Sequence, residues 1–223
     1  MKKLLDRIFI DGLGGMAQGL FATLIIGTII QQIGLFMGGG TGDLIYELGK
    51  IAAGLTGAGI GVGVARKLEA GHLVIVSAAV VGMIGAFAGK ILSGQVLVDG
   101  NLVLAGPGEP LGAFAAAYLA IEIGILISGK TKLDIRLTPL VCIGTGSAVG
   151  LFVGPPISEF MLWLGSLINW GTEQQPFLMG IVVSVLMGMI LTLPISSAAL
   201  GVILNLSGLA AGAATIGCCC NMI

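Results

Sequence analysis

Charged side chains are scarce in this 223-residue chain: Lys, Arg, Asp and Glu make up 9% of it, whereas 56% of the residues are hydrophobic. A soluble domain carries about 25% charged residues, so the chain has too few charges to cover a water-facing surface. Its mean hydropathy of +1.09, and apolar runs that approach the ~20 residues of a membrane-crossing helix, indicate an integral membrane protein. The net charge of −1 and the lack of a basic patch exclude a nucleic-acid partner.

Residues that carry chemistry are also few. The chain has one histidine, His72, and four cysteines, Cys142, Cys218, Cys219 and Cys220. No cysteine spacing resembles a zinc site. The cysteines are interpreted as small apolar residues of packed helices, with a soft-metal or redox role for the last three as the alternative. No catalytic residues, cofactor or metal site are expected.

Alternating strand patterns are missing from the apolar runs, which argues against a β-barrel. We therefore expect an all-α, polytopic helical membrane protein with about six to eight transmembrane helices in a single transmembrane domain over 1–223, after a short cytoplasmic amphipathic lead at 1–11. The expected spans are 13–37, 44–65, 72–93, 110–128, 136–153 and 176–193. A seventh stretch, 157–171, contains Trp163 and Trp170, which favour the membrane interface, so it is either a short span or a helix on the membrane surface.

Basic residues are unevenly distributed between the expected loops. Eight of the ten fall at the N-terminus, after the second span or after the fourth: Lys2, Lys3, Arg7, Arg66, Lys67, Lys130, Lys132 and Arg136. The opposite loops, 38–43 and 94–109, contain acidic residues and no Lys or Arg. The positive-inside rule then predicts a multi-pass protein of the plasma membrane with a cytoplasmic N-terminus. In the external loop, the run VLVDGNLVL predicts a hairpin near 95–104.

A proline and two serines interrupt the apolar stretch LTLPISSAAL at 191–200. Pro194 removes a backbone donor, and Ser196 or Ser197 can cap a new helix. Transporters use such broken helices to bind polar solutes near the membrane midplane, so we predict a discontinuous helix and a solute site here. A kinked structural helix is the alternative.

Two acidic residues complete the candidate site. Glu122 lies inside the fourth span, where a carboxyl group is expensive and normally faces a cavity or a partner. Glu159 follows the Pro-Pro pair of GPPISEF and is expected at a helix N-terminus, where the helix dipole favours negative charge. We predict that both residues bind the solute. The alternative for Glu122 is a structural hydrogen bond to a neighbouring helix, and the alternative for Glu159 is a helix cap near the membrane interface.

Glycines recur where helices should approach closely. Gly57 and Gly61 in LTGAGIGVGVA form a GxxxG face that predicts close packing against another helix. A similar pattern returns in SGLAAGAATIG at 207–217. The first two spans and the block 176–217 share a polar-interrupted helix followed by a Gly/Ala-rich one, which suggests an inverted repeat.

Several stretches together resemble a known family: RIFIDGLGGMAQGLFATLIIGTI, LTGAGIGVGVA, GPPISEFMLWLG, QPFLMGIVVSVLMGM, LTLPISSAAL and SGLAAGAATIGCC. They are similar to EIIC-like membrane proteins of the phosphotransferase system, also called PTS sugar transporter subunit IIC, in the perfringolysin-regulator-like branch. The resemblance covers nearly the whole chain. It implies a bacterial inner-membrane permease that works with soluble phosphoryl-donating subunits and forms a homodimer. At most, the chain would be the permease component of that enzyme system.

The chain departs from the family pattern in two ways. Sugar permeases of this superfamily use an intramembrane histidine and glutamate near the sugar, but His72 lies at the edge of a predicted span. Family members also usually continue past the final CCCNMI, which implies a truncated form. Our first hypothesis is a permease for a small polar solute, with Glu122, Glu159, Pro194, Ser196 and Ser197 as binding residues. The alternatives are an ion-coupled or channel-like protein, and a membrane sensor that transports nothing.

Overall fold

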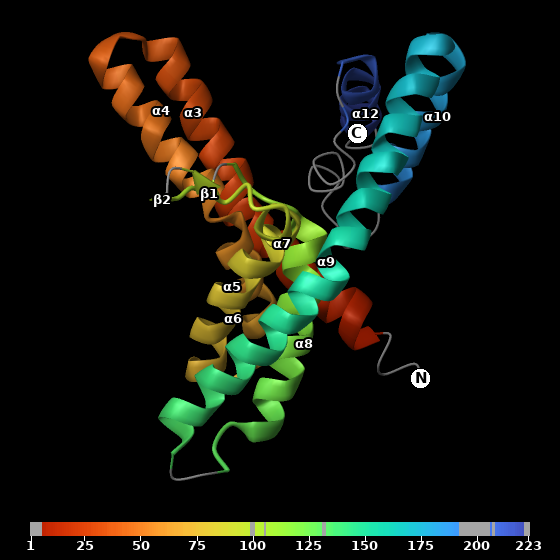
Figure 1. Ribbon diagram of the computed structural model, residues 1–223. Coiled ribbons are helices and arrows are strands. Elements are labelled where there is room, and N and C mark those ends of the chain that lie inside the picture. Colours follow the sequence, from red (N-terminus) through yellow and green to blue (C-terminus); the bar gives the residue numbers. More distant parts are fainter. Residues whose placement is uncertain are drawn as a thin grey trace. The chain divides into compact units, whose positions relative to one another are not determined.

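The computed structural model describes residues 6–98, 101–104, 106–130, 133–191, 206 and 208–220. The chain divides into two compact units, Met1–Pro156 and Ile157–Ile223, and each is described by itself. The first contains a helical bundle and the second a pair of packed helices (Figure 1). The prediction of a single transmembrane domain stays a prediction.

A long helix begins the first unit at Arg7. It consists of η1 (Arg7–Gly12), α2 (Leu13–Leu20), η2 (Phe21–Ile25) and α3 (Ile26–Met37), in which η1 and η2 are π-helical. Helical backbone therefore continues from residue 7 through the expected start of the span at residue 13, and the amphipathic lead at 1–11 stays a prediction. The helix ends at Gly38, whose positive φ of 61° is a backbone conformation that glycine adopts far more readily than other residues.

The second expected span, 44–65, is broken in the structure. Helix α4 (Gly39–Gly54) and helix α5 (Thr56–Lys67) meet at Leu55 and are bent by 49° relative to each other. The Thr56 hydroxyl donates a hydrogen bond of 2.6 Å to the carbonyl of Ala53, and Gly54 weakens the helix just before the break. The bend lets α4 follow α3 while α5 packs against α2 and α6 (Figure 1).

Glycine-mediated contacts hold the bundle together. A Cβ atom on Gly57 would lie 2.6 Å from the carbonyl oxygen of Gly82, and one on Gly61 would lie 2.6 Å from the carbonyl carbon of Ala78. Both neighbours belong to α6 (His72–Ala86), so the predicted GxxxG face is confirmed. The branched side chains of Ile60, Val64, Val74 and Val81 are fully buried around these contacts.

The expected third span, 72–93, also ends early. Phe87 separates α6 from the short helix α7 (Ala88–Leu92). Beyond α7, β1 (Leu97–Val98) pairs antiparallel with β2 (Asn101–Leu102), with Leu97 opposite Leu102. This ribbon lies within the range 95–104 that the sequence indicated.

Helix α8 (Pro110–Ile127) matches the fourth expected span and has Pro110 in its first turn. Helix α9 (Asp134–Gln174) is continuous over 41 residues and contains Pro139, Pro155 and Pro156. The Pro-Pro pair therefore does not begin a new helix, and 157–171 is not a separate element, contrary to the prediction. Prolines are tolerated inside membrane helices where neighbouring groups satisfy the freed carbonyls.

The second unit contains the C-terminal part of α9, α10 (Pro176–Leu191) and α12 (Gly208–Cys220). Val183 and Met187 of α10 form a buried cluster with Ala214 of α12. Gly217 permits the close approach, because a Cβ atom there would overlap the backbone of Ser184. The predicted break at 191–200 lies almost entirely outside the described residues.

Three of the described helical segments are long and apolar enough to cross a membrane: Arg7–Met37, Pro110–Ile127 and Asp134–Ile157. The bent pair α4 and α5 makes a fourth if it is counted as one span. These helices confirm an all-α polytopic membrane protein, with a discontinuous helix at Leu55. The six to eight spans and the inverted repeat stay predictions.

Candidate functional site

An ion pair joins the beginning of the chain to the fourth expected span. The Arg7 Nε atom in the first turn of η1 donates to the Glu122 Oε1 atom of α8 across 2.8 Å. The two side chains are 40% and 32% exposed, so the pair is half-buried. Charged residues of membrane helices usually pair with one another or face a cavity, and Glu122 has such a partner in Arg7.

Tyr118 lies one turn before Glu122 on α8, and its ring packs against Phe114 with a centroid distance of 5.7 Å. Its hydroxyl group is buried and has no hydrogen-bond partner of good geometry among the described residues. The hydroxyl is nevertheless close enough to Glu122 and Arg7 to interact with both side chains through hydrogen bonding and charge. These two neighbours reduce the cost of about 1–3 kcal/mol that a completely unpaired buried hydroxyl would carry.

A charged cavity of about 710 Å³ opens next to the ion pair. It lies where the first helix begins and α5 ends. Its lining consists of Asp6, Arg7, Asp11, Arg66, Lys67, Leu68 and Glu69. Arg7 belongs both to the ion pair and to the cavity lining, so it lies between the half-buried carboxylate of Glu122 and the polar cavity.

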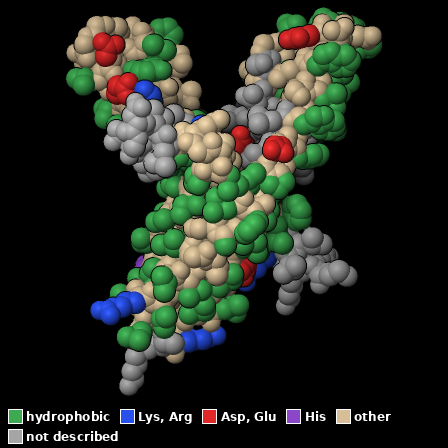
Figure 2. Space-filling model, viewed as in Figure 1, with side chains coloured by type: hydrophobic (Ala, Val, Ile, Leu, Met, Phe, Trp, Pro, Cys, Tyr) green, Lys and Arg blue, Asp and Glu red, His purple; other side chains and the backbone are tan. Residues whose placement is uncertain are grey.

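The segments that contain the basic residues meet at one end of this unit. The cavity brings the start of the first helix to the end of α5. A Cβ atom on Gly71 would lie 3.3 Å from the Ser128 hydroxyl, so the α5–α6 loop lies beside the end of α8. In Figure 2, basic side chains are also seen toward the lower end of this unit. The predicted orientation requires such grouping, but which side of the membrane this end faces stays a prediction.

Glu109 lies at the other end of α8, immediately before the span begins. Its backbone N–H donates to the carbonyl of Ala86 across 2.7 Å, which ties the loop to the end of α6. Burial raises the pKa of the Glu109 carboxyl group above its ordinary value, and the positive charge of Lys90 partly opposes this rise. The loop before α8 thus contains a titratable group whose neutral form the fold favours.

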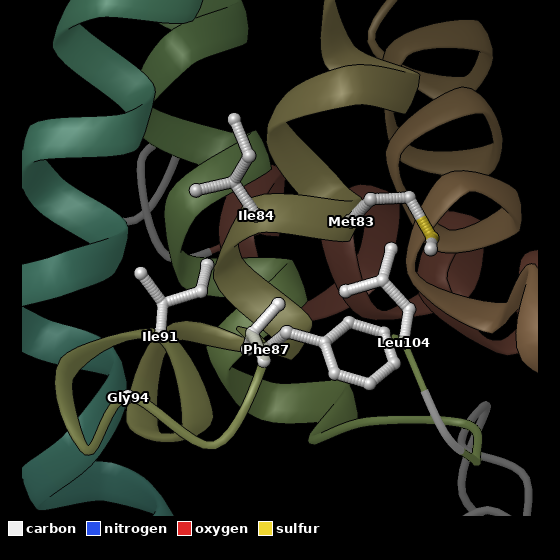
Figure 3. Close-up of a pocket in the computed structure, with 7 residues that line it drawn as sticks. Met83, Ile84, Phe87, Ile91, Gly94 and Leu104 are labelled. Atoms are coloured by element: carbon white, nitrogen blue, oxygen red, sulfur yellow. The ribbon is translucent and has the colours of Figure 1, made fainter. Parts of the chain in front are cut away.

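An apolar cavity of about 320 Å³ lies beneath the ribbon segment. Figure 3 shows Phe87 and Leu104 in its lining, together with Met83, Ile84, Ile91 and Gly94. The Lys90 Nζ atom is 5.4 Å from the centre of the Phe87 ring. The cavity lining presents almost no polar surface, so this cavity is not suited to a polar solute.

Of the five predicted site residues, the structure describes Glu122 and Glu159. Glu159 is exposed and lies in the interior of α9, not at a helix N-terminus as predicted. It belongs to the second unit, whereas Glu122 belongs to the first. Pro194, Ser196 and Ser197 lie outside the described residues. The role of these residues in solute binding stays a prediction.

Neither Arg7 nor Tyr118 was predicted from the sequence as a neighbour of Glu122. Tyr118 could have been found, because residues four apart on a helix lie on the same face. Arg7 could not, because 115 residues separate it from Glu122 and nothing in the local sequence marks the contact.

The family model described as phosphotransferase system, EIIC, matches residues 10–223, which is nearly the whole chain. No curated protein and no solved structure gives a significant match to the chain. The family match agrees with the apolar helices of a membrane protein, and it confirms the resemblance at the level of the family. The chain therefore belongs to the phosphotransferase-system EIIC family and is an integral membrane protein of the sugar-transporter IIC type.

Proposed function

We propose that the protein carries a small polyhydroxylated solute across the membrane and that Arg7, Tyr118 and Glu122 form part of the solute pathway. The observation that carries this proposal is the half-buried Arg7–Glu122 ion pair, which has the Tyr118 hydroxyl close to it and whose Arg7 also lines the charged cavity. Together these groups offer both hydrogen-bond donors and acceptors to a solute with several hydroxyl groups.

The three side chains supply complementary hydrogen-bonding groups. The Glu122 carboxylate accepts hydrogen bonds from sugar hydroxyls, the Arg7 guanidinium donates, and the Tyr118 hydroxyl does either. A hydrogen bond to a charged group contributes about 1.5–3 kcal/mol and a neutral one about 1 kcal/mol. The charged cavity lined by Arg7 would connect this point to the predicted cytoplasmic side.

The predicted helix break at 194–197 remains a second part of this proposal. A break there would free backbone N–H groups, and Ser196 and Ser197 would add hydroxyls. Glu159 is retained as a weaker candidate because it is exposed.

The proposal also includes a homodimer in the bacterial inner membrane, a cytoplasmic N-terminus, and cooperation with soluble phosphotransferase subunits.

Uptake of labelled sugars into proteoliposomes tests the proposal, with phosphoenolpyruvate and the soluble subunits either present or left out. Glu122→Gln should raise the solute KM about tenfold through loss of a charged hydrogen bond. Glu47→Gln is the matched control, because Glu47 also pairs with a cation, Lys50, at 3.5 Å, but is exposed on α4. Flux that is equal in both variants would remove Glu122 from the pathway.

A double variant separates solute binding from a purely structural pair. If Glu122 acts only by pairing with Arg7, then Arg7→Gln together with Glu122→Gln should restore stability and uptake relative to either single variant. If Glu122 binds the solute, uptake should stay impaired in the double variant even when thermal stability recovers.

A further set of measurements addresses the helix break and the competing functions. Ser197→Ala should weaken solute binding by about 1 kcal/mol, and Pro194→Ala should weaken it more, because a re-formed helix would hide its donors. Solute-independent conductance would favour the channel-like alternative. Altered transcription on deletion, without any flux, would favour the sensor.

A further inference from the structure

Two cavities of opposite character share a wall in the first unit. The first is the charged cavity already described, at the ends of the first helix and α5. The second is an apolar groove of about 450 Å³ between α2–η2 and α5. Arg66, in the last turn of α5, lines both. The polar cavity and the apolar groove therefore adjoin at Arg66, and this pairing of polar and apolar surfaces suits an amphiphile.

The groove results from glycines that bring two helices close together. A Cβ atom on Gly19 would lie 2.5 Å from the carbonyl carbon of Gly59, so neither helix can carry side chains at the contact. Ala22, Leu55 and Val62 line the depression as apolar side chains. The hydroxyl of Thr23 donates to the carbonyl of Gly19 across 2.7 Å. That donor is used internally, and the exposed Gln18 is the other uncharged polar side chain in the lining, so the part of the groove beside Ala22, Leu55 and Val62 suits a hydrocarbon chain.

The charged cavity contains both signs of charge in equal number. Its cations are Arg7, Arg66 and Lys67, and its anions are Asp6, Asp11 and Glu69. A simple anion would be attracted by the first set and repelled by the second. A zwitterion with a phosphate and a primary ammonium group can satisfy both sets. Arg7 already binds Glu122, which leaves Arg66 and Lys67 as the phosphate ligands and the carboxylates as ammonium ligands.

We propose that this double cavity binds a phospholipid with an ethanolamine headgroup. The phosphate lies against Arg66 and Lys67, the ammonium group donates to Asp11 and Glu69, and one acyl chain occupies the groove beside Ala22 and Val62. A choline headgroup is excluded from the same contacts because its quaternary nitrogen has no N–H to donate. The lipid would join the first helix to α5 at the end of the unit where the basic residues meet.

Binding is measured on the purified full chain after delipidation, by native mass spectrometry and by thermal shift. The probes are phosphatidylethanolamine, phosphatidylcholine and phosphatidylglycerol of the same chain length. We expect the ethanolamine lipid to bind roughly tenfold more tightly than the choline lipid, the effect of one lost charged hydrogen bond. Equal binding of the ethanolamine and choline lipids would overturn the proposal.

Variants of the charged cavity test which residues bind the lipid headgroup. Arg66→Gln and, separately, Lys67→Gln should each reduce ethanolamine-lipid binding about tenfold, whereas Lys130→Gln is the control because Lys130 is basic and exposed but does not line the cavity. Asp11→Asn should shift the preference toward phosphatidylglycerol. Unchanged binding in both basic variants would overturn the headgroup assignment.

The groove is tested by Ala22→Phe, which fills it from an exposed position, against Val76→Phe at an exposed position of α6 that lines neither cavity. Only Ala22→Phe should expel the lipid. Soluble phosphoethanolamine and a sugar phosphate complete the series. If either binds as tightly as the lipid, the cavity is a site for a soluble phosphate compound and the lipid proposal fails, whatever the uptake assays show.

Discussion

Replacing Gly61 with alanine should destabilise the protein through a single added methyl group. Gly61 lies in the middle of α5 and faces α6. Its new Cβ would lie 2.6 Å from the carbonyl carbon of Ala78 and 3.1 Å from the backbone nitrogen of Ala79. Comfortable carbon–carbon contacts are about 3.5–4.0 Å, so the two helices must separate by roughly 1 Å at this point.

The size of the effect follows from that displacement. The obstructing atoms are backbone and cannot rotate away, and overpacking of this kind typically costs about 1–3 kcal/mol. Alanine also gains up to about 1 kcal/mol over glycine inside a helix, which partly hides the cost. Gly144→Ala on α9 is the matched control, because nothing lies within 4 Å of its Cβ position. The difference between the two variants should therefore be about 1–3 kcal/mol.

Unfolding is followed in detergent by heat and by a denaturant series. A difference of 1 kcal/mol corresponds to roughly 2–4 °C in Tm for a chain of about this length. Gly144→Ala should be neutral or slightly stabilising, and Gly61→Ala should melt lower by the corresponding amount. If both variants melted together, α5 and α6 would not be in backbone contact, and the glycine face would have another purpose.

Two further predictions concern the ends of the first unit. Because burial raises the pKa of Glu109 above its ordinary value of 4.5, the folded state keeps a proton that the unfolded chain releases, so the free energy of unfolding should fall as pH rises above that value. Glu109→Gln should flatten this part of a stability–pH profile, and an unchanged slope would contradict the assignment. The orientation is tested by cysteine substitution at the exposed Lys130 in a chain whose four native cysteines are replaced by serine. A membrane-impermeant thiol reagent should label Lys130→Cys only after the cytoplasmic side is opened, and labelling of intact cells would reverse the topology.

Part of the candidate site could be anticipated from sequence. A carboxyl group inside an apolar run is expensive enough to require a partner, which marked Glu122 without naming Arg7. The partner of the Glu122 carboxylate comes from a helix turn 115 residues away. Local sequence patterns do not predict contacts over such a separation. The predicted role of Glu159 at a helix N-terminus was wrong because α9 continues through Pro155 and Pro156.

The sequence by itself determined that this is a helical membrane protein, since scarce charge and continuous apolar runs leave only helices able to satisfy the backbone in a bilayer. It also determined the glycine face of α5, because GxxxG spacing is a local property of one helix. Only the tertiary structure decided that the second span bends at Leu55 and that Arg7 reaches Glu122. Those outcomes depend on which helices pack together. The local sequence allows several backbone conformations of similar free energy, and the contacts between helices decide which one forms.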